Sequence, residues 1–172
     1  MKKLAILTVN YNNYRVTEDL LQSLVKQKDK NFKVYIADLS DKKKKISRNT
    51  RVLRNFSEVG FTDVVVGENK GYASGVNLAL KQAVKQGFER FIVINNDTEV
   101  ASDFTNAVSA SLDKNPESVL GGKIYYFSGY EYHAKRYKKS DLGKVLWYAG
   151  GIMDWDNAYT RHRGVDEVDS GQ

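Results

Sequence analysis

Short apolar runs alternate with segments of helical periodicity through the first two thirds of the sequence, and this alternation limits the fold more than any other feature. The apolar runs of strand length span residues 4–9, 32–39, 63–66 and 90–95. The helical segments carry apolar residues every three or four positions, at 16–25, 76–88 and 104–115. Strands that alternate with helices pair in parallel through right-handed crossovers. The sequence therefore predicts an α/β fold with a mainly parallel sheet flanked by helices.

The pattern changes after Pro116, which closes the last of these helical segments. Residues 120–127 and 144–149 are predicted strands, and the stretch between them reads as a loop. The tail from Gly150 is polar and offers no face that could form a core. Earlier in the chain, a weakly helical segment is expected at 44–59.

The composition favours a single globular domain. With 172 residues, of which 41% are hydrophobic, the chain can bury one sizeable core. We therefore expect one domain over residues 1–172, with an α/β half at 1–115 and the start of a second region at 116–172.

The absence of cysteine limits the chemistry that the chain can perform. It excludes disulfides and thiolate metal sites. A metal would be held by oxygen or imidazole ligands, and oxygen ligands favour Mg²⁺ or Mn²⁺. Lys2 and Lys3 precede an apolar stretch that is too short for a signal peptide, and no apolar run is long enough to cross a bilayer. We expect a cytoplasmic chain that contacts a membrane only from its surface, if at all.

The formal net charge of +6 suits nucleic acid, an anionic membrane or a phosphate-bearing substrate. Charge alone does not choose among them. Much of the positive charge lies between Lys42 and Arg54, and such a run is usually the solvated face of a helix, so we assign it no catalytic role. A nucleic-acid-binding domain is one alternative, but no recognised binding motif accompanies the basic segment.

A polar segment follows each of the four apolar runs, at residues 10–13, 38–41, 67–75 and 95–97. Ligands of parallel sheets bind at the carboxyl ends of the strands, where these segments are expected to meet. Tyr11 can offer its ring to a base, and Asp38 can accept a hydrogen bond from the N–H of a uracil- or thymine-type ring. Gly71 and Gly75 allow close approach of the backbone, and a helix that begins near Ser74 would direct free N–H groups at a diphosphate.

Each polar segment also has a simpler explanation, because strand ends often carry Asn, Asp and Gly only to form turns. Their convergence at one edge of the sheet favours a ligand site. The sequence contains no G-x-G-x-x-G, no G-x-x-x-x-G-K-[ST] and no H-E-x-x-H. The predicted site is therefore neither a standard dinucleotide site nor a P-loop.

Several motifs resemble the family 2 glycosyltransferases of GT-A fold, in particular bacterial rhamnosyltransferase-like members. Their order and spacing agree over nearly the whole chain, and the segment 68–77 with the following Asn-Asn-Asp is the most specific part. The resembling segments are TVNYN (8–12), ADLS (37–40), ENKGYASGVN (68–77), INND (94–97), WYAGG (147–151), HRG (162–164) and DSGQ (169–172). The resemblance implies a Rossmann-like sheet, with residues 1–115 as the nucleotide-binding half and 116–172 as the start of the acceptor-side region.

The resemblance also implies roles for individual residues. Asp38 would contact the nucleobase or its ribose, and residues 69–71 would lie along the ribose and diphosphate. Residues 95–97 occupy the place of the family's D-x-D motif, whose last carboxylate holds a divalent cation, Mg²⁺ or Mn²⁺, that neutralises the leaving group. The predicted substrate-binding residues are Asn10, Tyr11, Asp38, Asn69, Lys70, Gly71, Asn95 and Asn96, and the predicted metal ligand is Asp97.

Two features depart from the family pattern. The first residue of the motif is Asn95 instead of aspartate, which removes one charge and lowers the expected metal affinity. The catalytic base is unknown, since the family carries it in a segment expected beyond Gln172. The acidic residues of the tail and His162 are not assigned this role.

These inferences predict an inverting, metal-dependent glycosyltransferase. It would transfer a sugar from a UDP- or dTDP-linked donor to a glycan or lipid-linked acceptor, as in cell wall or polysaccharide biosynthesis. Without its base, the chain itself is expected to be inactive. The alternative is a non-catalytic module that binds a sugar nucleotide or a glycan. We expect a cytoplasmic location with association at the inner face of the membrane, and no nucleic-acid partner.

Overall fold

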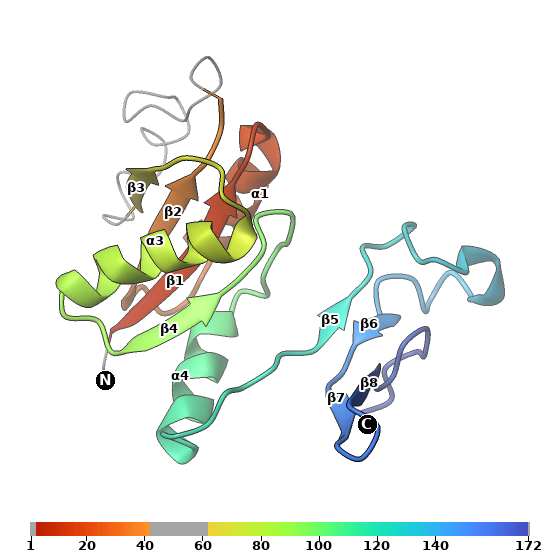
Figure 1. Ribbon diagram of the computed structural model, residues 1–172. Coiled ribbons are helices and arrows are strands. Elements are labelled where there is room, and N and C mark those ends of the chain that lie inside the picture. The colour runs from red at the N-terminus through yellow and green to blue at the C-terminus, as the bar shows by residue number, and fades with distance from the viewer. Residues whose placement is uncertain (1–2, 42–61, 172) are drawn as a thin grey trace. The chain divides into compact units, whose positions relative to one another are not determined.

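The computed structural model describes residues 3–41 and 62–171 of the chain (Figure 1). The chain forms two compact units, divided after Pro116. The helical segment predicted at 44–59 and the basic segment lie outside the described residues. No helix in the described ranges is long and apolar enough to cross a lipid bilayer.

The first unit contains a four-stranded parallel sheet (Figure 1). Its strands are β1 (Leu4–Asn10), β2 (Phe32–Asp38), β3 (Thr62–Val66) and β4 (Arg90–Val93), in the order β3-β2-β1-β4. The register pairs Asn10 of β1 with Asp38 of β2, so the polar residues that end these two strands are neighbours. Because β1 lies between β2 and β4, the strand order reverses beside β1, which is where ligands of such sheets bind.

Helices cover both faces of this sheet. The α3 helix (Tyr72–Lys85) packs on one face through Ala79 and Ala83. The α1 helix (Tyr14–Val25) and the α4 helix (Phe104–Lys114) pack on the other face. Every residue of β1 is buried, which explains why this strand reads as a continuous apolar run without polar alternation. The predicted α/β architecture is confirmed.

The α3 helix lies close to the sheet because small residues face it. A Cβ atom on Gly75 would lie 2.9 Å from Val9 Cγ2 and 3.0 Å from Leu39 Cδ1. Gly75 is buried, so its missing side chain serves the packing of the helix, and the expectation that it admits a ligand stays a prediction. The helix also begins at Tyr72 and not near Ser74, directly after the helix N-cap residue Gly71, whose φ is +92°.

The last strand of the sheet is shorter than predicted. It ends at Val93, and the N–H of Ile94 donates one further hydrogen bond to the Leu7 carbonyl at 3.0 Å. Asn95 already lies beyond the strand, just before a turn at 96–97, and its carbonyl accepts a hydrogen bond from Thr98 Oγ1 at 2.7 Å. The Asn-Asn-Asp motif therefore occupies a loop beyond the strand.

The second unit consists of short elements. They are β5 (Ile124–Tyr125), the 3₁₀ helix η2 (Ala134–Arg136), β6 (Leu146–Tyr148), β7 (Gly151–Asp154) and β8 (Tyr159–His162). The β5 strand pairs antiparallel with β6, and β7 pairs antiparallel with β8. The strands predicted at 120–127 and 144–149 are thus shorter than expected, and the region read as a loop contains η2.

The sequence analysis did not predict the hairpin of β7 and β8, because it treated this part of the chain as a polar tail. Every residue of both strands is exposed, so they lack the apolar alternation that marks a half-buried strand. The carboxylate of Asp154 shapes the turn by accepting hydrogen bonds from the N–H groups of Asp156 and Asn157, each at 3.1 Å. The tail forms regular structure through backbone pairing while contributing little to a core.

Candidate functional site

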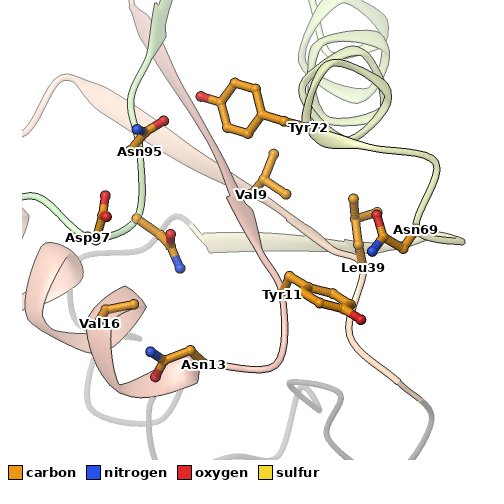
Figure 2. A pocket seen from close by; sticks show the side chains of 10 residues that line it. Val9, Tyr11, Asn13, Val16, Leu39, Asn69, Tyr72, Asn95 and Asp97 are labelled. Carbon is orange, nitrogen blue, oxygen red and sulfur yellow. The ribbon is translucent and has the colours of Figure 1, made fainter.

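A pocket of about 550 Å³ opens at the carboxyl ends of β1, β2 and β4. Figure 2 shows its side chains, which come from the end of β1 and the turn after it, the start of α1, the residue after β2, the loop before α3, the first residue of α3 and the loop after β4. The lining residues are Val9, Tyr11, Asn13, Val16, Leu39, Asn69, Tyr72, Asn95, Asn96 and Asp97. The four polar segments at the strand ends thus meet around one cavity.

The pocket has chemically different sides. Asn95 and Asp97 lie on one side, whereas Asn69 and Tyr11 lie on the opposite side (Figure 2). Tyr11 and Tyr72 are each 49% exposed, so two aromatic rings border the opening. Aromatic faces can stack on a planar base, while amide and carboxylate groups bind polar or charged atoms. The lining suits a ligand with a planar group at one end and a charged group at the other.

The turn after β1 holds Tyr11 at the wall of the pocket. Asn12 has φ +55°, a left-handed conformation that asparagine tolerates. Its N–H donates to Ser40 Oγ at 2.8 Å, and its side-chain amide donates to Asp41 Oδ2 at 3.0 Å. The N–H of Asp41 in turn donates to Asn12 Oδ1 at 3.1 Å. These bonds tie the loop after β1 to the loop after β2.

Asn10 and Asp38 lie beneath the pocket and do not line it. Both are fully buried. Asn10 Nδ2 donates to Asp38 Oδ1 at 3.0 Å and to Ser40 Oγ at 2.9 Å, and the N–H of Ser40 also donates to Asp38 Oδ1 at 3.1 Å. The described contacts of both side chains are therefore with the protein, and their direct contact with a substrate stays a prediction.

The segment before α3 contributes one side chain to the pocket, Asn69. Asn69 Oδ1 also accepts a hydrogen bond from the N–H of Gly71 at 3.1 Å. Lys70 lies outside the lining and forms an exposed ion pair with Glu68 at 3.4 Å, which contributes little to stability. Gly71 also lies outside the lining. It is the N-cap residue of α3 and makes no side-chain cap bond, so the N–H groups of the first helical turn remain available to an anion.

Asp97 supplies the carboxylate of the pocket. The side of the pocket that carries Asp97 is otherwise lined by the amides of Asn95 and Asn96. The atoms that could coordinate a metal ion are therefore oxygens, which suit Mg²⁺ or Mn²⁺. Within the described ranges, no group of three or more His, Cys, Asp or Glu side chains is placed to hold a metal ion. A divalent cation fits this site only if a ligand supplies further oxygens, as the phosphates of a nucleotide do.

Tyr72 is a pocket residue that the sequence analysis did not identify. Burial raises the pKa of its phenol, and the negative charge of Asp97 raises it further. The phenol consequently remains protonated at neutral pH, and its O–H is a hydrogen-bond donor within the pocket. The feature of the sequence that could have identified Tyr72 as a pocket residue is its position directly after Gly71.

The structure adds four further lining residues that were not predicted as site residues, namely Val9, Asn13, Val16 and Leu39. Asn13 and Leu39 belong to polar segments that were expected to reach the site. Val9 and Val16 were assigned to a strand and to the apolar face of a helix. Nothing in a local apolar pattern separates a core residue from one that also borders a cavity.

Residues 5–165 match the family model for glycosyl transferase family 2. The chain belongs to this family. The resemblance inferred from the strand-end motifs is thereby confirmed. A comparison with curated proteins gave no significant match.

Solved structures confirm the GT-A type fold of this family 2 chain. The structure of S. aureus TarS 1–349 is 21% identical with a TM-score of 0.53, over 65% of this chain and 32% of that one. The same TarS fragment in complex with UDP is 16% identical with a TM-score of 0.51, over 73% of this chain and 40% of that one. The family 2 chain thus spans well under half the length of these TarS structures.

Proposed function

We propose that this chain forms the donor-binding part of a glycosyltransferase that uses a UDP- or dTDP-linked sugar. The observation that carries the proposal is that aromatic, amide and carboxylate side chains from separate strand ends meet in one pocket. Membership of glycosyl transferase family 2 supports sugar transfer as the activity. The TarS fragment that was crystallised with UDP shares the fold, which agrees with a uridine nucleotide as one donor.

The proposed division of labour follows the two sides of the pocket. Tyr11 and Asn69 would bind the base and ribose, and the free N–H groups at the start of α3 would face the diphosphate. Asp97 would hold a Mg²⁺ or Mn²⁺ ion together with the phosphates, and Asn95 and Asn96 would contribute amide oxygens or orient the donor. The cation would neutralise charge on the nucleoside diphosphate as it leaves.

The acceptor side is proposed from the family alone. Transfer with inversion requires a base that removes the proton of the acceptor hydroxyl. Asp97 is the only carboxylate among the described lining residues and is already committed to the cation, so no described residue is assigned as the base. A glycan or lipid-linked acceptor, a role in cell wall or polysaccharide biosynthesis and a site of action at the inner face of the membrane are parts of this proposal.

The presence of only one carboxylate in the described lining also favours a second candidate function. A non-catalytic module that recognises a sugar nucleotide or a glycan needs no base. Such a module would bind UDP without dependence on Mn²⁺, or would bind glycans alone.

Titration calorimetry with UDP, dTDP and GDP, each with and without Mn²⁺, tests the proposal. We expect UDP or dTDP to bind more tightly when Mn²⁺ is present, and Asp97→Ala to weaken this Mn²⁺-dependent binding by roughly 10- to 100-fold. The matched control is Asp103→Ala, because Asp103 is an exposed aspartate at the start of α4 without a side-chain cap bond. If none of the three nucleotides binds, or if Asp97→Ala binds like the control, the proposal is wrong.

A further inference from the structure

A continuous chain of hydrogen bonds runs beneath the pocket from the end of β2 to the loop after β4. Asn10 Nδ2 donates to Asp38 Oδ1 at 3.0 Å. Thr17 Oγ1 donates to Asn10 Oδ1 at 2.9 Å and accepts from Asn96 Nδ2 at 2.9 Å. Thr17 therefore connects the buried Asn10–Asp38 pair, by hydrogen bonds, to the loop that carries Asp97.

Thr17 occupies this position because of its place on α1. The apolar face of the helix includes Leu20, Leu21 and Leu24, and residue 17 precedes them at helical spacing on the same face. Its side chain is consequently buried with 0% exposure, at the end of the helix nearest the carboxyl ends of the strands. Thr17 thus lies at the N-terminal end of the apolar face of α1, and its hydroxyl points toward the polar ends of β1 and β2.

The direction of the hydrogen bonds is determined by the groups that take part. Asp38 Oδ1 also accepts from the N–H of Ser40, so the amide of Asn10 turns its Nδ2 toward Asp38 and its Oδ1 toward Thr17. The Thr17 hydroxyl donates its single proton to Asn10 Oδ1 at 2.9 Å, with the Asn13 carbonyl farther away at 3.5 Å, and a lone pair of its oxygen accepts from Asn96 Nδ2. One buried hydroxyl thus links the buried Asn10–Asp38 pair to Asn96 in the pocket lining.

We propose that Thr17 is a positioning residue that couples the buried Asn10–Asp38 pair, at the ends of β1 and β2, to the Asp97 loop. Its bond to Asn96 holds the side chain that immediately precedes Asp97, and its bond to Asn10 orients the amide that supports Asp38. This inference rests on the proposed function, because it treats Asp97 as the cation ligand. The consequence is that binding of UDP and binding of Mn²⁺ strengthen each other through Thr17.

The substitution Thr17→Val removes the hydroxyl while keeping the shape of the side chain. Asn96 Nδ2 and Asn10 Oδ1 then lose a shared partner, and the loop at 95–97 gains freedom. We expect Mn²⁺-dependent UDP affinity in titration calorimetry to fall about tenfold, the scale of losing an outer partner of a metal ligand. Thr17→Ser restores the hydroxyl and should restore most of the affinity.

Thr105 provides a matched control for general loss of stability. It is also a fully buried threonine, and its hydroxyl contacts Gln27 Oε1 at 3.2 Å and the Asp29 carbonyl at 3.0 Å. Thr105→Val therefore removes a comparable buried hydroxyl from residues outside the pocket lining. It should lower the thermal unfolding temperature as Thr17→Val does, but should leave UDP and Mn²⁺ binding unchanged.

Two further measurements separate the positioning role from the proposed function. Amide hydrogen exchange at residues 95–98 of the ligand-free chain should be faster in Thr17→Val than in Thr105→Val. Thr17→Val and Asn96→Ala should be non-additive in UDP affinity, because both remove the same bond. Equal exchange and equal UDP affinity in Thr17→Val and Thr105→Val would overturn the positioning role. Failure of the parent chain to bind UDP or dTDP would instead overturn the proposed function, together with the cation coupling.

Discussion

At the scale of single residues, Tyr11 and Tyr14 show how position decides which side chain lines the pocket. They are close in sequence and equally exposed, at 49% and 50%, but only Tyr11 lines the pocket. The tie between Asn12 and the loop after β2 accounts for this difference, because it holds the preceding residue against the cavity.

We predict that Tyr11→Ala weakens UDP binding by roughly 5- to 150-fold, corresponding to about 1–3 kcal/mol for a base stacked on an aromatic ring. Tyr11→Phe keeps the ring and should bind almost like the parent chain. Titration calorimetry of Tyr14→Ala supplies the control. Equal losses in Tyr11→Ala and Tyr14→Ala would show that the ring of Tyr11 does not hold the base.

Thr17 and Asn10 mark the limit of sequence reasoning at this scale. The sequence analysis treated residue 17 as part of a helix and expected Asn10 to touch the substrate. In the structure both side chains lie in one buried network, where they bond to each other, Asn10 also bonds to Asp38 and Ser40, and Thr17 also bonds to Asn96, 79 residues away. The type of side chain revealed its bonding capacity, whereas its partners depend on segments that only the fold brings together.

At the scale of elements, the packing of α3 on the sheet determines the floor of the pocket. Gly75 leaves room for Val9 and Leu39, which both line the cavity. A larger side chain at position 75 would press on these two residues and separate the helix from the sheet.

We expect Gly75→Leu to lower the free energy of unfolding by about 1–3 kcal/mol, as overpacking does in a filled core, and to narrow the pocket. Urea denaturation measures the first effect and UDP affinity measures the second. Asn77→Leu places the same side chain at an exposed position of α3 and should change stability by no more than about 0.5 kcal/mol. A Gly75→Leu chain as stable as Asn77→Leu would contradict the close packing of α3.

The elements differ in how well the sequence predicted them. The buried strand β1 and the amphipathic helix α1 leave local signals, since burial on two faces or on one helical face selects apolar residues in a recognisable spacing. The hairpin of β7 and β8 has no such signal, because all its residues are exposed and its strands are held by backbone bonds.

At the scale of the whole molecule, the chain comprises two units that are stabilised differently. The first unit is built on buried apolar strands, whereas the second relies on polar contacts such as those of Asp169. Asp169 accepts hydrogen bonds from the Tyr125 hydroxyl, from Lys123 Nζ at 2.9 Å and from the N–H of Gly171 at 2.9 Å. The bonds from Tyr125, Lys123 and Gly171, in that order, lower the pKa of Asp169 to about 2.

We predict that acid weakens the second unit through Asp169. Its pKa is lower in the folded chain than the value of about 4 expected after unfolding, so the stabilisation is complete above about pH 4 and is lost as the pH falls toward 2. NMR signals of the Tyr125 ring should report this loss in an acid titration. Asp169→Asn should remove the transition, while Asp156→Asn, in the exposed β7–β8 turn, should keep it. Persistence of the transition in Asp169→Asn would assign it to another group.

The sequence by itself determined the parallel sheet, its flanking helices and the presence of polar segments at the strand ends, because strand and helix periodicity are local properties. It could not decide which polar side chains face the cavity. Tyr11, Asn69 and Asp97 line the pocket, whereas Asn10 and Asp38 are buried beneath it. The tertiary structure made that choice, since the direction of each side chain depends on strand register and on hydrogen-bond partners from distant parts of the chain.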